Sequence, residues 1–483
     1  MLLATLLLVA PGAVSGAATP ASPLLPPDHW AVKAAERLEE VGLLERYLPA
    51  QRSVPLLEVA RALAEGEARA RRVRPELSPL IAAWRERLRE EWSGAEGEPR
   101  GARLLGAQLG LGVEGGAAHP TPAGPPPRSA LFLEAPRVAP FVEGAGGAAY
   151  GGHLAAGLRG RATPWRARLA SAELVGALGP VTLSVGRGQV GYGPNEYGGV
   201  VATGAASMDR VELFTAPLRL PGPLRVLGDF AFDTALARFS EPRHPYHPLL
   251  WQFQLQWRPH SRLTLAIIRG VMFGGALWDG IPTGQIPLAL LGLKNYRENN
   301  LYSVSVRYRL PTEALLPLTA RLEWGSDDNP GAWATWPGLV VGLTAPMLPR
   351  LQASLGVEYA YFGDGPVGWH PPFPWYGHGQ YTGGWATGQT PLGDPLGGNG
   401  WALRLVGSAD PFGGRTRLSA VAWVQKREQD NLYAPSAGGT SAGIRGEAEL
   451  RFRRGAVGVR GSYERGQGGW SRSEVAGTGT VYF

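Results

Sequence analysis

Residues 251–257 read WQFQLQW, a stretch in which large apolar side chains alternate with amides at every position. Its odd positions hold Trp251, Phe253, Leu255 and Trp257, and its even positions hold glutamines. Because successive side chains of a strand point to opposite sides, the four apolar residues share one face. A strand with one apolar and one amide face is typical of a membrane barrel, with lipid outside and polar groups inside.

The same alternation returns in later stretches of the chain. These are LYSVSVRYRL (301–310), LQASLGVEYAY (351–361) and RGEAELRFR (445–453). In the first and last of them the charged residues all fall on one face. We therefore expect Arg307, Arg309, Arg451 and Arg453 to face the lumen of the barrel.

Soluble β-sandwiches also alternate, so three further features decide between the classes, one of which is the export signal described below. Aromatic residues stand near the ends of the expected strands, as in interfacial girdles: Trp251, Trp257, Tyr302, Tyr308, Tyr359 and Tyr361. The final residues VAGTGTVYF end in Phe483 and resemble the terminal strand that the barrel-insertion machinery reads in outer-membrane proteins. We predict an all-β fold, an antiparallel transmembrane barrel of about 16–18 strands over residues 103–483.

The first residues predict export. An apolar run from Leu2 to Ala10 is followed by small residues near Ser15, so we interpret residues 1–18 as a signal peptide. That run is too short to span a bilayer as a helix, and no later apolar run is long enough. The expected location is therefore the outer membrane of a Gram-negative-type envelope, as an integral protein.

Residues 26–92 read as helices and form an expected helical head, which we place in the periplasm. In DHWAVKAAERLEEVG, apolar residues recur at helical spacing from Trp30. A second helix is expected from about Pro55 to Ala68 and a third from Pro79 to Trp92. A Pro- and Gly-rich loop is expected around residues 119–130.

Composition narrows the function classes. The 16 Trp and 15 Tyr argue against a disordered chain despite 69 Gly. With no cysteine, disulfides, thiol nucleophiles and Cys-ligated metals are excluded. The net charge of +7 suits anionic glycans or lipopolysaccharide, and no nucleic-acid motif is present.

Motifs for catalysis or cofactors carry little weight. GRGQVG at residues 186–191 matches a dinucleotide pattern, but Pro194 and Gly198 follow where a helix should begin. His244 and His247 lack an acidic third ligand nearby, so a surface loop is the better interpretation. We expect no cofactor, no metal site and no catalytic residue.

Three segments resemble the Wzi family of capsule assembly proteins, in the family's order. They are GRGQVGYGPNEYGG (186–199), RHPYHPLLWQFQLQWRPHSRLTLAIIRGVMFGG (243–275) and WYGHGQYTGGWATGQTPLGDPLGGNGWALRL (375–405). The resemblance implies an outer-membrane barrel with a small periplasmic helical bundle. It also implies a role in holding or assembling surface polysaccharide.

The head carries a second likeness. Residues 29–63 resemble an S-layer homology module, with Trp30 and Ala31 at its start and Pro49 before the second helix. Such modules usually carry Arg-Ala-Glu after a Thr, whereas here Pro55 and two leucines precede Glu58. The likeness implies cell-wall polymer as a partner, and a packed helical plug or dock is the alternative.

The segment 364–385 has the composition of a glycan-binding surface. Flat rings stack on sugar C–H faces while imidazoles and amides bond hydroxyls. The glycan-binding candidates are Trp369, His370, Trp375, Tyr376, His378, Gln380, Tyr381 and Trp385. An aromatic loop that plugs the barrel or lies on lipid headgroups is the alternative for the same residues.

We interpret the chain as a non-enzymatic, lectin-like outer-membrane barrel that attaches or assembles surface or capsular polysaccharide. Its expected partners are that polysaccharide, outer-membrane lipid such as lipopolysaccharide, and the barrel-insertion machinery. A diffusion porin is the alternative function, because the inward arginines would also suit an anion-preferring pore. An enzyme with Ser, His and an acid brought together in space is the third class.

Overall fold

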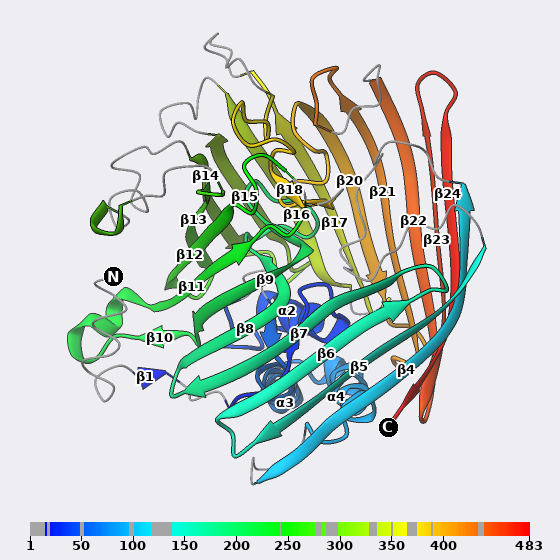
Figure 1. Cartoon of the computed structure of the whole chain (residues 1–483). Helices are drawn as coiled ribbons and strands as arrows, with labels where there is room; N and C mark the ends of the chain where they lie inside the picture. Colours follow the sequence, from blue (N-terminus) through cyan, green and yellow to red (C-terminus); the bar gives the residue numbers. More distant parts are fainter. Residues whose placement is uncertain are drawn as a thin grey trace.

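The computed structural model describes residues 15–16, 20–48, 53–95, 101–117, 138–241, 243–276, 282–285, 298–327, 336–348, 351–364, 374–387, 390–432 and 439–483. Within these residues, 18 antiparallel strands close into one barrel (Figure 1). In chain order they are β4 (Ala102–Ala117), β5 (Ala139–Tyr150), β6 (Leu154–Ala162), β7 (Ala167–Leu178), β8 (Val181–Gly191), β9 (Thr203–Thr215), β11 (Asp229–Arg238), β12 (Leu249–His260), β13 (Leu263–Phe273), β14 (Asn299–Arg309), β15 (Thr319–Asp327), β16 (Pro337–Leu348), β17 (Ala353–Phe362), β20 (Gly400–Ala409), β21 (Thr416–Arg427), β22 (Gly439–Phe452), β23 (Gly455–Gly466) and β24 (Ser471–Tyr482).

The last strand closes the barrel on the first. β24 pairs with β4, with Val475 opposite Gly115 and Tyr482 opposite Gln108. Phe483 extends this pairing, since its backbone N–H donates to the carbonyl of Ala107 at 2.9 Å. The fold class is therefore confirmed, at the upper end of the expected strand number.

The face assignment of β12 is also confirmed. Gln252, Gln254 and Gln256 are between 2% and 4% exposed and lie inside the barrel. The alternate residues are partly exposed on the outer face, with Trp257 at 37%. Because side chains alternate, this register puts the amides in the lumen and the apolar residues toward lipid.

The helical head lies inside the ring of strands (Figure 1). Its helices are α2 (Trp30–Glu40), α3 (Leu56–Val73) and α4 (Ser78–Glu91), with a 3-10 turn, η1, at Pro75–Leu77. The second helix continues five residues beyond the expected end at Ala68, because none of the residues up to Val73 is a glycine or a proline. No helix in the described part of the chain is long and apolar enough to cross a membrane.

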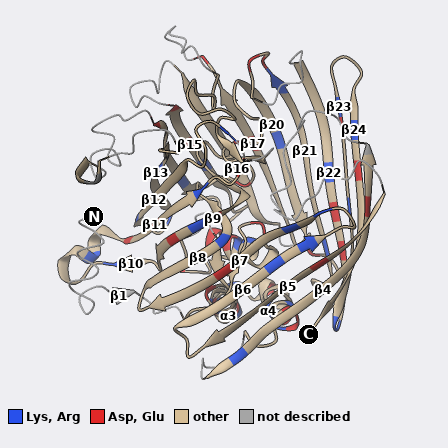
Figure 2. Cartoon of the chain, viewed as in Figure 1, with Lys and Arg blue, Asp and Glu red and all other residues tan. Residues whose placement is uncertain are grey.

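Ion pairs join the head to the barrel wall. Arg258 on β12 and Arg307 on β14 contact Glu39 at 2.8 and 2.6 Å, and Arg321 on β15 pairs with Glu40. All five side chains are at most 6% exposed. Figure 2 shows charged residues along the strands that surround the helices. These inward arginines of β12, β14 and β15 therefore serve to hold the head.

The two ends of the barrel differ. Short turns such as Gly151–His153 and Ser261–Arg262 gather at the end that holds the C-terminus, while the longest connection, between β17 and β20, lies at the other. In barrels of this kind short turns face the periplasm and long loops face outward. The head occupies the short-turn end, and the long connections form the outer end.

Two-residue strands lie between the longer elements of the described residues. β1 (Ser15–Gly16) pairs with β10 (Leu218–Arg219) beside β11, and β2 (Leu24–Leu25) pairs with β3 (Val54–Pro55). β18 (Ala386–Thr387) pairs with β19 (Thr390–Pro391) within the long outer connection. Two further 3-10 turns are η2 (Gly222–Leu227) and η3 (Thr283–Gln285).

Candidate functional site

Two outer connections fold inward and fill the outer half of the barrel. The first inward segment is residues 192–202, between β8 and β9, and the second comprises residues 374–387 and 390–399, between β17 and β20. The backbone N–H of Thr203 donates to the carbonyl of Leu392 at 2.8 Å and joins them. Together they form the outer plug.

Aromatic side chains form the core of the outer plug. Trp375, Tyr376, Tyr381 and Trp385 have no exposed surface. Trp375 packs edge-on against Phe362 of β17, with ring centroids 5.1 Å apart. Burial on this scale makes the rings the apolar interior of the plug.

Hydrogen bonds fix two of these rings, those of Tyr376 and Trp385, to the first inward segment. The hydroxyl of Tyr376 donates to the carbonyl of Val200 at 2.7 Å and accepts from the N–H of Asp394 at 2.9 Å. The indole N–H of Trp385 donates to the carbonyl of Val201 at 2.7 Å. Because all four rings are fully buried, they present no face to a glycan and cannot serve as stacking platforms while the plug stays folded.

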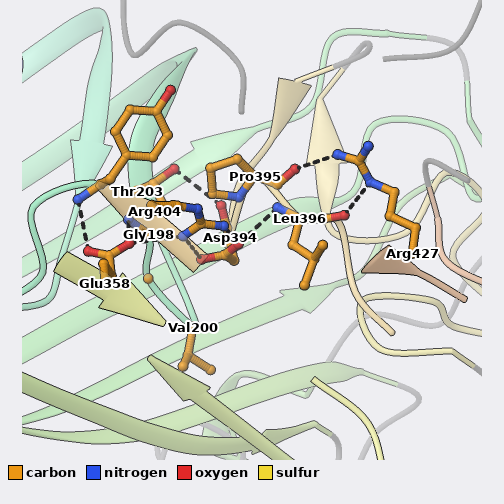
Figure 3. A network of polar contacts seen from close by, with 12 residues as sticks. Gly198, Val200, Thr203, Glu358, Asp394, Pro395, Leu396, Arg404 and Arg427 are labelled. Carbon is orange, nitrogen blue, oxygen red and sulfur yellow. Dashed lines mark hydrogen bonds and ion pairs between the residues drawn. The ribbon is translucent and has the colours of Figure 1, made fainter. Parts of the chain in front are cut away.

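A buried ionic cluster anchors the outer plug to the wall (Figure 3). Arg404 of β20 lies between Asp394 of the second inward segment and Glu358 of β17, at 3.0 Å from Asp394 Oδ2 and 2.9 Å from Glu358 Oε1. Glu358 in turn accepts the backbone N–H groups of Tyr197 and Gly198 at 3.1 and 2.7 Å. One guanidinium and two carboxylates therefore hold both inward segments.

Arg427 of β21 adds a second anchor in the same view (Figure 3). Its Nε donates to the carbonyl of Leu396 at 2.8 Å, and its Nη2 donates to the carbonyl of Pro395 at 3.2 Å. These two carbonyls lie in a loop, where no neighbouring strand can donate a hydrogen bond to them. The buried guanidinium of Arg427 supplies those hydrogen bonds instead.

Gly198 is required where the chain passes this cluster. A Cβ atom there would lie 2.2 Å from Asp394 Oδ2 and 2.4 Å from Arg404 Nη1. Any side chain at position 198 would therefore displace the ion pair.

Polar residues from two outer connections meet on the exposed side of the plug. The backbone N–H of His244 donates to the hydroxyl of Thr382 at 2.7 Å, and the N–H of Thr382 donates to the carbonyl of His244 at 2.8 Å. Gln380 is exposed, and Tyr246 is 54% exposed. We call His244, Tyr246, His378, Gln380 and Thr382 the outer patch.

His378 is half-buried within the outer patch. Its Nδ1 accepts the N–H of Gln380 at 3.2 Å, and its ring lies 5.4 Å from that of Tyr381. Burial lowers the pKa of His378 below its ordinary value, so the imidazole is neutral near pH 7 and its Nε2 can donate a hydrogen bond.

The remaining predicted residues divide into three groups. Trp369 and His370 lie outside the described residues. Arg307, Arg309 and Arg451 face inward and contact the head, Arg309 through the carbonyl of Glu39 at 2.9 Å. Arg453 was expected in the lumen but lies exposed in the turn after β22, because the strand ends at Phe452.

Reasoning from sequence missed the anchors Glu358, Asp394, Arg404 and Arg427. Glu358 and Arg404 lie on strands whose side chains alternate between the lumen and the lipid. The alternation could therefore have shown that both side chains point into the lumen. Their pairing with Asp394 could not, since the path of a long connection has no periodicity.

A family model describes residues 143–469, about two thirds of the chain, as capsule assembly protein Wzi. The chain belongs to the Wzi family of capsule assembly proteins. This confirms the resemblance drawn from the three segments and, with the closed barrel, an integral outer-membrane location.

Solved structures agree on the fold. An Escherichia coli structure described as Wzi, an outer membrane protein involved in group 1 capsule assembly and a carbohydrate-binding β-barrel, aligns over 96% of this chain and 99% of its own. Its TM-score is 0.71 at 15% identity, so the likeness shows the shared fold.

Other comparisons add less. OccD3 of Pseudomonas aeruginosa aligns over 80% of this chain and 92% of its own, with a TM-score of 0.47 at 11% identity. OprD of the same organism covers 81% and 96%, with a TM-score of 0.48 at 9% identity. Scores at this level carry no argument about function. No curated protein matches the chain.

Proposed function

We propose that this Wzi-family barrel binds surface polysaccharide through the outer patch and thereby attaches or assembles a capsular layer, without catalysing a reaction. The observation that carries the proposal is the inward folding of both outer segments, which turns the long connections into a fixed surface. A binding surface gains from such rigidity, since little conformational freedom is lost when the ligand binds.

The chemistry of the outer patch supports a sugar ligand. Tyr246 offers an exposed ring for sugar C–H faces. Gln380 and Thr382 offer an amide and a hydroxyl, and neutral His378 offers an N–H donor. Of the eight sequence candidates, His378 and Gln380 keep this proposed role.

The porin alternative is supported less well. In the described residues, three of the four arginines expected to line a pore contact the head instead, and buried rings occupy the outer half. A diffusion pore needs a continuous aqueous path through the barrel. Neither the head at one end nor the outer plug at the other favours such a path.

Two further partners follow from the barrel's position. We propose that the exposed apolar residues of the outer wall, such as Leu109, Val457 and Val475, contact membrane lipid. We also propose that the insertion machinery reads β24 with Phe483. Cell-wall polymer is a weaker partner, because ten of the eleven residues of α2 are buried against neighbours.

The test is polysaccharide retention in cells. Deletion of the gene should release the surface polysaccharide, and the full-length chain should restore it. Tyr246→Ala and Gln380→Ala should restore it poorly, whereas Phe412→Ala should restore it fully, since Phe412 is an exposed ring in the turn after β20, at the other end. Retention of polysaccharide in the deletion strain would contradict the proposal.

A further inference from the structure

The lipid-facing wall of the barrel carries a row of charged residues on β8, β9 and β11. Arg187, Asp209 and Arg238 form this row, since Asp209 is the register partner of Arg187 on one side and of Arg238 on the other. The row faces outward because Arg210 and Ala237, which are next to Asp209 and Arg238 in the chain, point into the lumen and are 4% and 3% exposed. Charge on the lipid side of a barrel is costly within the hydrocarbon layer, so the row needs a polar environment.

An apolar row lies directly beneath the charged row. Val185, Val211 and Leu236 are register partners on the same three strands, two residues nearer the short-turn end. They are 45%, 47% and 42% exposed. Two residues of a strand span about 7 Å, so charged and apolar groups follow each other within one step of the wall. Such a step is the profile of a membrane interface, with acyl chains against the lower row and headgroups beside the upper one.

Trp251 of β12 marks the level of this step. It is the register partner of Leu236, and its indole N–H donates to the hydroxyl of Thr234 at 2.9 Å. Tryptophans of membrane barrels gather at the headgroup level. Arg238 is the last residue of β11 and pairs with Leu249, the first residue of β12. The charged row therefore lies at the headgroup level of the outer end.

The two arginines of the row differ in their contacts. Arg187 donates from Nη1 to Asp209 Oδ1 and from Nε to the carbonyl of Leu169, both at 2.9 Å. Arg187 therefore fixes and neutralises the carboxylate. Arg238 is exposed, and it makes no ion pair or side-chain hydrogen bond with any residue that the structure describes. The row thus keeps one cation for a ligand.

The position of Arg238 indicates which anion fits. A guanidinium binds phosphate through two parallel hydrogen bonds, and basic residues at the membrane surface bind the headgroups of anionic lipids. The apolar row beneath Arg238 suits an anion that carries acyl chains. A free anion would gain nothing from that row.

We propose that this row is a headgroup site for a phosphorylated lipid of the outer leaflet, of the lipopolysaccharide type. Arg238 binds a phosphate group of the lipid, and the acyl chains lie on the apolar row. Arg187 is a positioning residue, because its ion pair with Asp209 keeps that carboxylate from repelling the phosphate. The inference rests on the lipid contact proposed for the outer wall and gives it a headgroup site, and it is independent of the outer patch.

The test uses the full chain in detergent micelles, with native mass spectrometry as the readout and diphosphoryl lipid A as the probe. Arg238→Gln should weaken binding about tenfold, because it removes charge-assisted hydrogen bonds. Arg238→Lys should keep most of the affinity, since an ammonium group also binds phosphate. Arg225→Gln is the matched control, because Arg225 is exposed in η2, at the opposite end of β9 and β11. Lipid A without its phosphates should bind the unaltered protein more weakly.

Equal affinity of Arg238→Gln and the unaltered protein, or an equal loss in Arg225→Gln, would overturn the site. Equal binding of dephosphorylated lipid A would overturn phosphate recognition and leave only the contact with the apolar wall. Displacement of the lipid by an equal concentration of inorganic phosphate would overturn the assignment to a lipid. Heat-modified gel mobility, which reports barrel closure, checks that the variants fold.

The lipid site and the polysaccharide role can fail separately. Tyr246→Ala should leave lipid A binding intact while it lowers polysaccharide retention. If neither form of lipid A bound, the lipid contact of the outer wall would be contradicted together with the headgroup site, whereas the polysaccharide role would stand.

Discussion

Arg321 Nη1 on β15 lies 2.7 Å from Glu196 Oε1 in the first inward segment. The same guanidinium pairs with Glu40 at the end of α2. One buried cation therefore connects the head at the short-turn end with the plug at the outer end. Arg321 therefore links the head to the outer plug through the lumen.

Arg321→Leu should loosen both the head and the outer plug. Removing the cation leaves Glu40 buried with Arg307 at 3.6 Å and leaves Glu196 without Arg321, and loss of one partner from a buried pair costs about 3–5 kcal/mol. Hydrogen exchange should show faster opening of α2 and of residues 192–202. Arg69→Gln, whose partner Glu45 is exposed, should cost about 0–1 kcal/mol. Equal protection in both variants would contradict the bridging role.

Trp385→Ala should unfold the outer plug locally. The indole is fully buried and donates to Val201, so truncation costs about 3–5 kcal/mol. In planar bilayers the unaltered protein should show no steady current, and the variant should show brief openings. Trp165→Ala, at a ring that is 70% exposed, should behave as the unaltered protein. A large steady current from the unaltered protein would support the porin instead.

The barrel could be predicted from the sequence because its signal is local and repeated. Each strand alternates with period two, as at residues 251–257, so facing follows from position alone. The helices of the head were found in the same way, through their 3.6-residue period.

The placement of the plugs could not be predicted in this way. Trp375 and Tyr381 have the composition of a sugar platform, and only the chain path shows that they are buried. Burial inside the lumen depends on contacts between distant residues, such as Asp394 with Glu358 through Arg404. No periodic pattern encodes these contacts, so composition alone left both interpretations open.

Acid should weaken the docking of the head through His29. The folded protein depresses the pKa of His29 well below 6.5, chiefly by burial and then by Arg159, Arg87 and Arg417. The unfolded head therefore takes up a proton first as the pH falls, so stability is present above pH 6.5 and is lost below it, by at most about 1.4 kcal/mol per pH unit.

His29→Asn is the variant that tests this pH effect. Asn can still cap α2 through its side-chain oxygen, yet it does not titrate. Protease resistance of the head, measured from pH 7.5 to 5.5, should fall in the unaltered protein relative to the variant. Glu40, whose pKa burial raises, acts in the opposite direction in both proteins, so their difference isolates His29. Parallel pH profiles would rule out the assignment.

Arg451 and Arg453 give a matched test of which arginines hold the head. Arg451 has a 7% exposed side chain whose Nη2 lies 3.1 Å from Glu90 Oε2 on α4, while Arg453 is exposed in the next turn. Arg451→Gln should lower the free energy of head docking by about 1–3 kcal/mol, because Glu90 loses its partner in a partly buried position. Arg453→Gln should change it by less than about 0.5 kcal/mol, as surface substitutions do. Hydrogen exchange of α4 measures both, and a comparable loss in the two variants would show that the turn at residues 453–454 also supports the head.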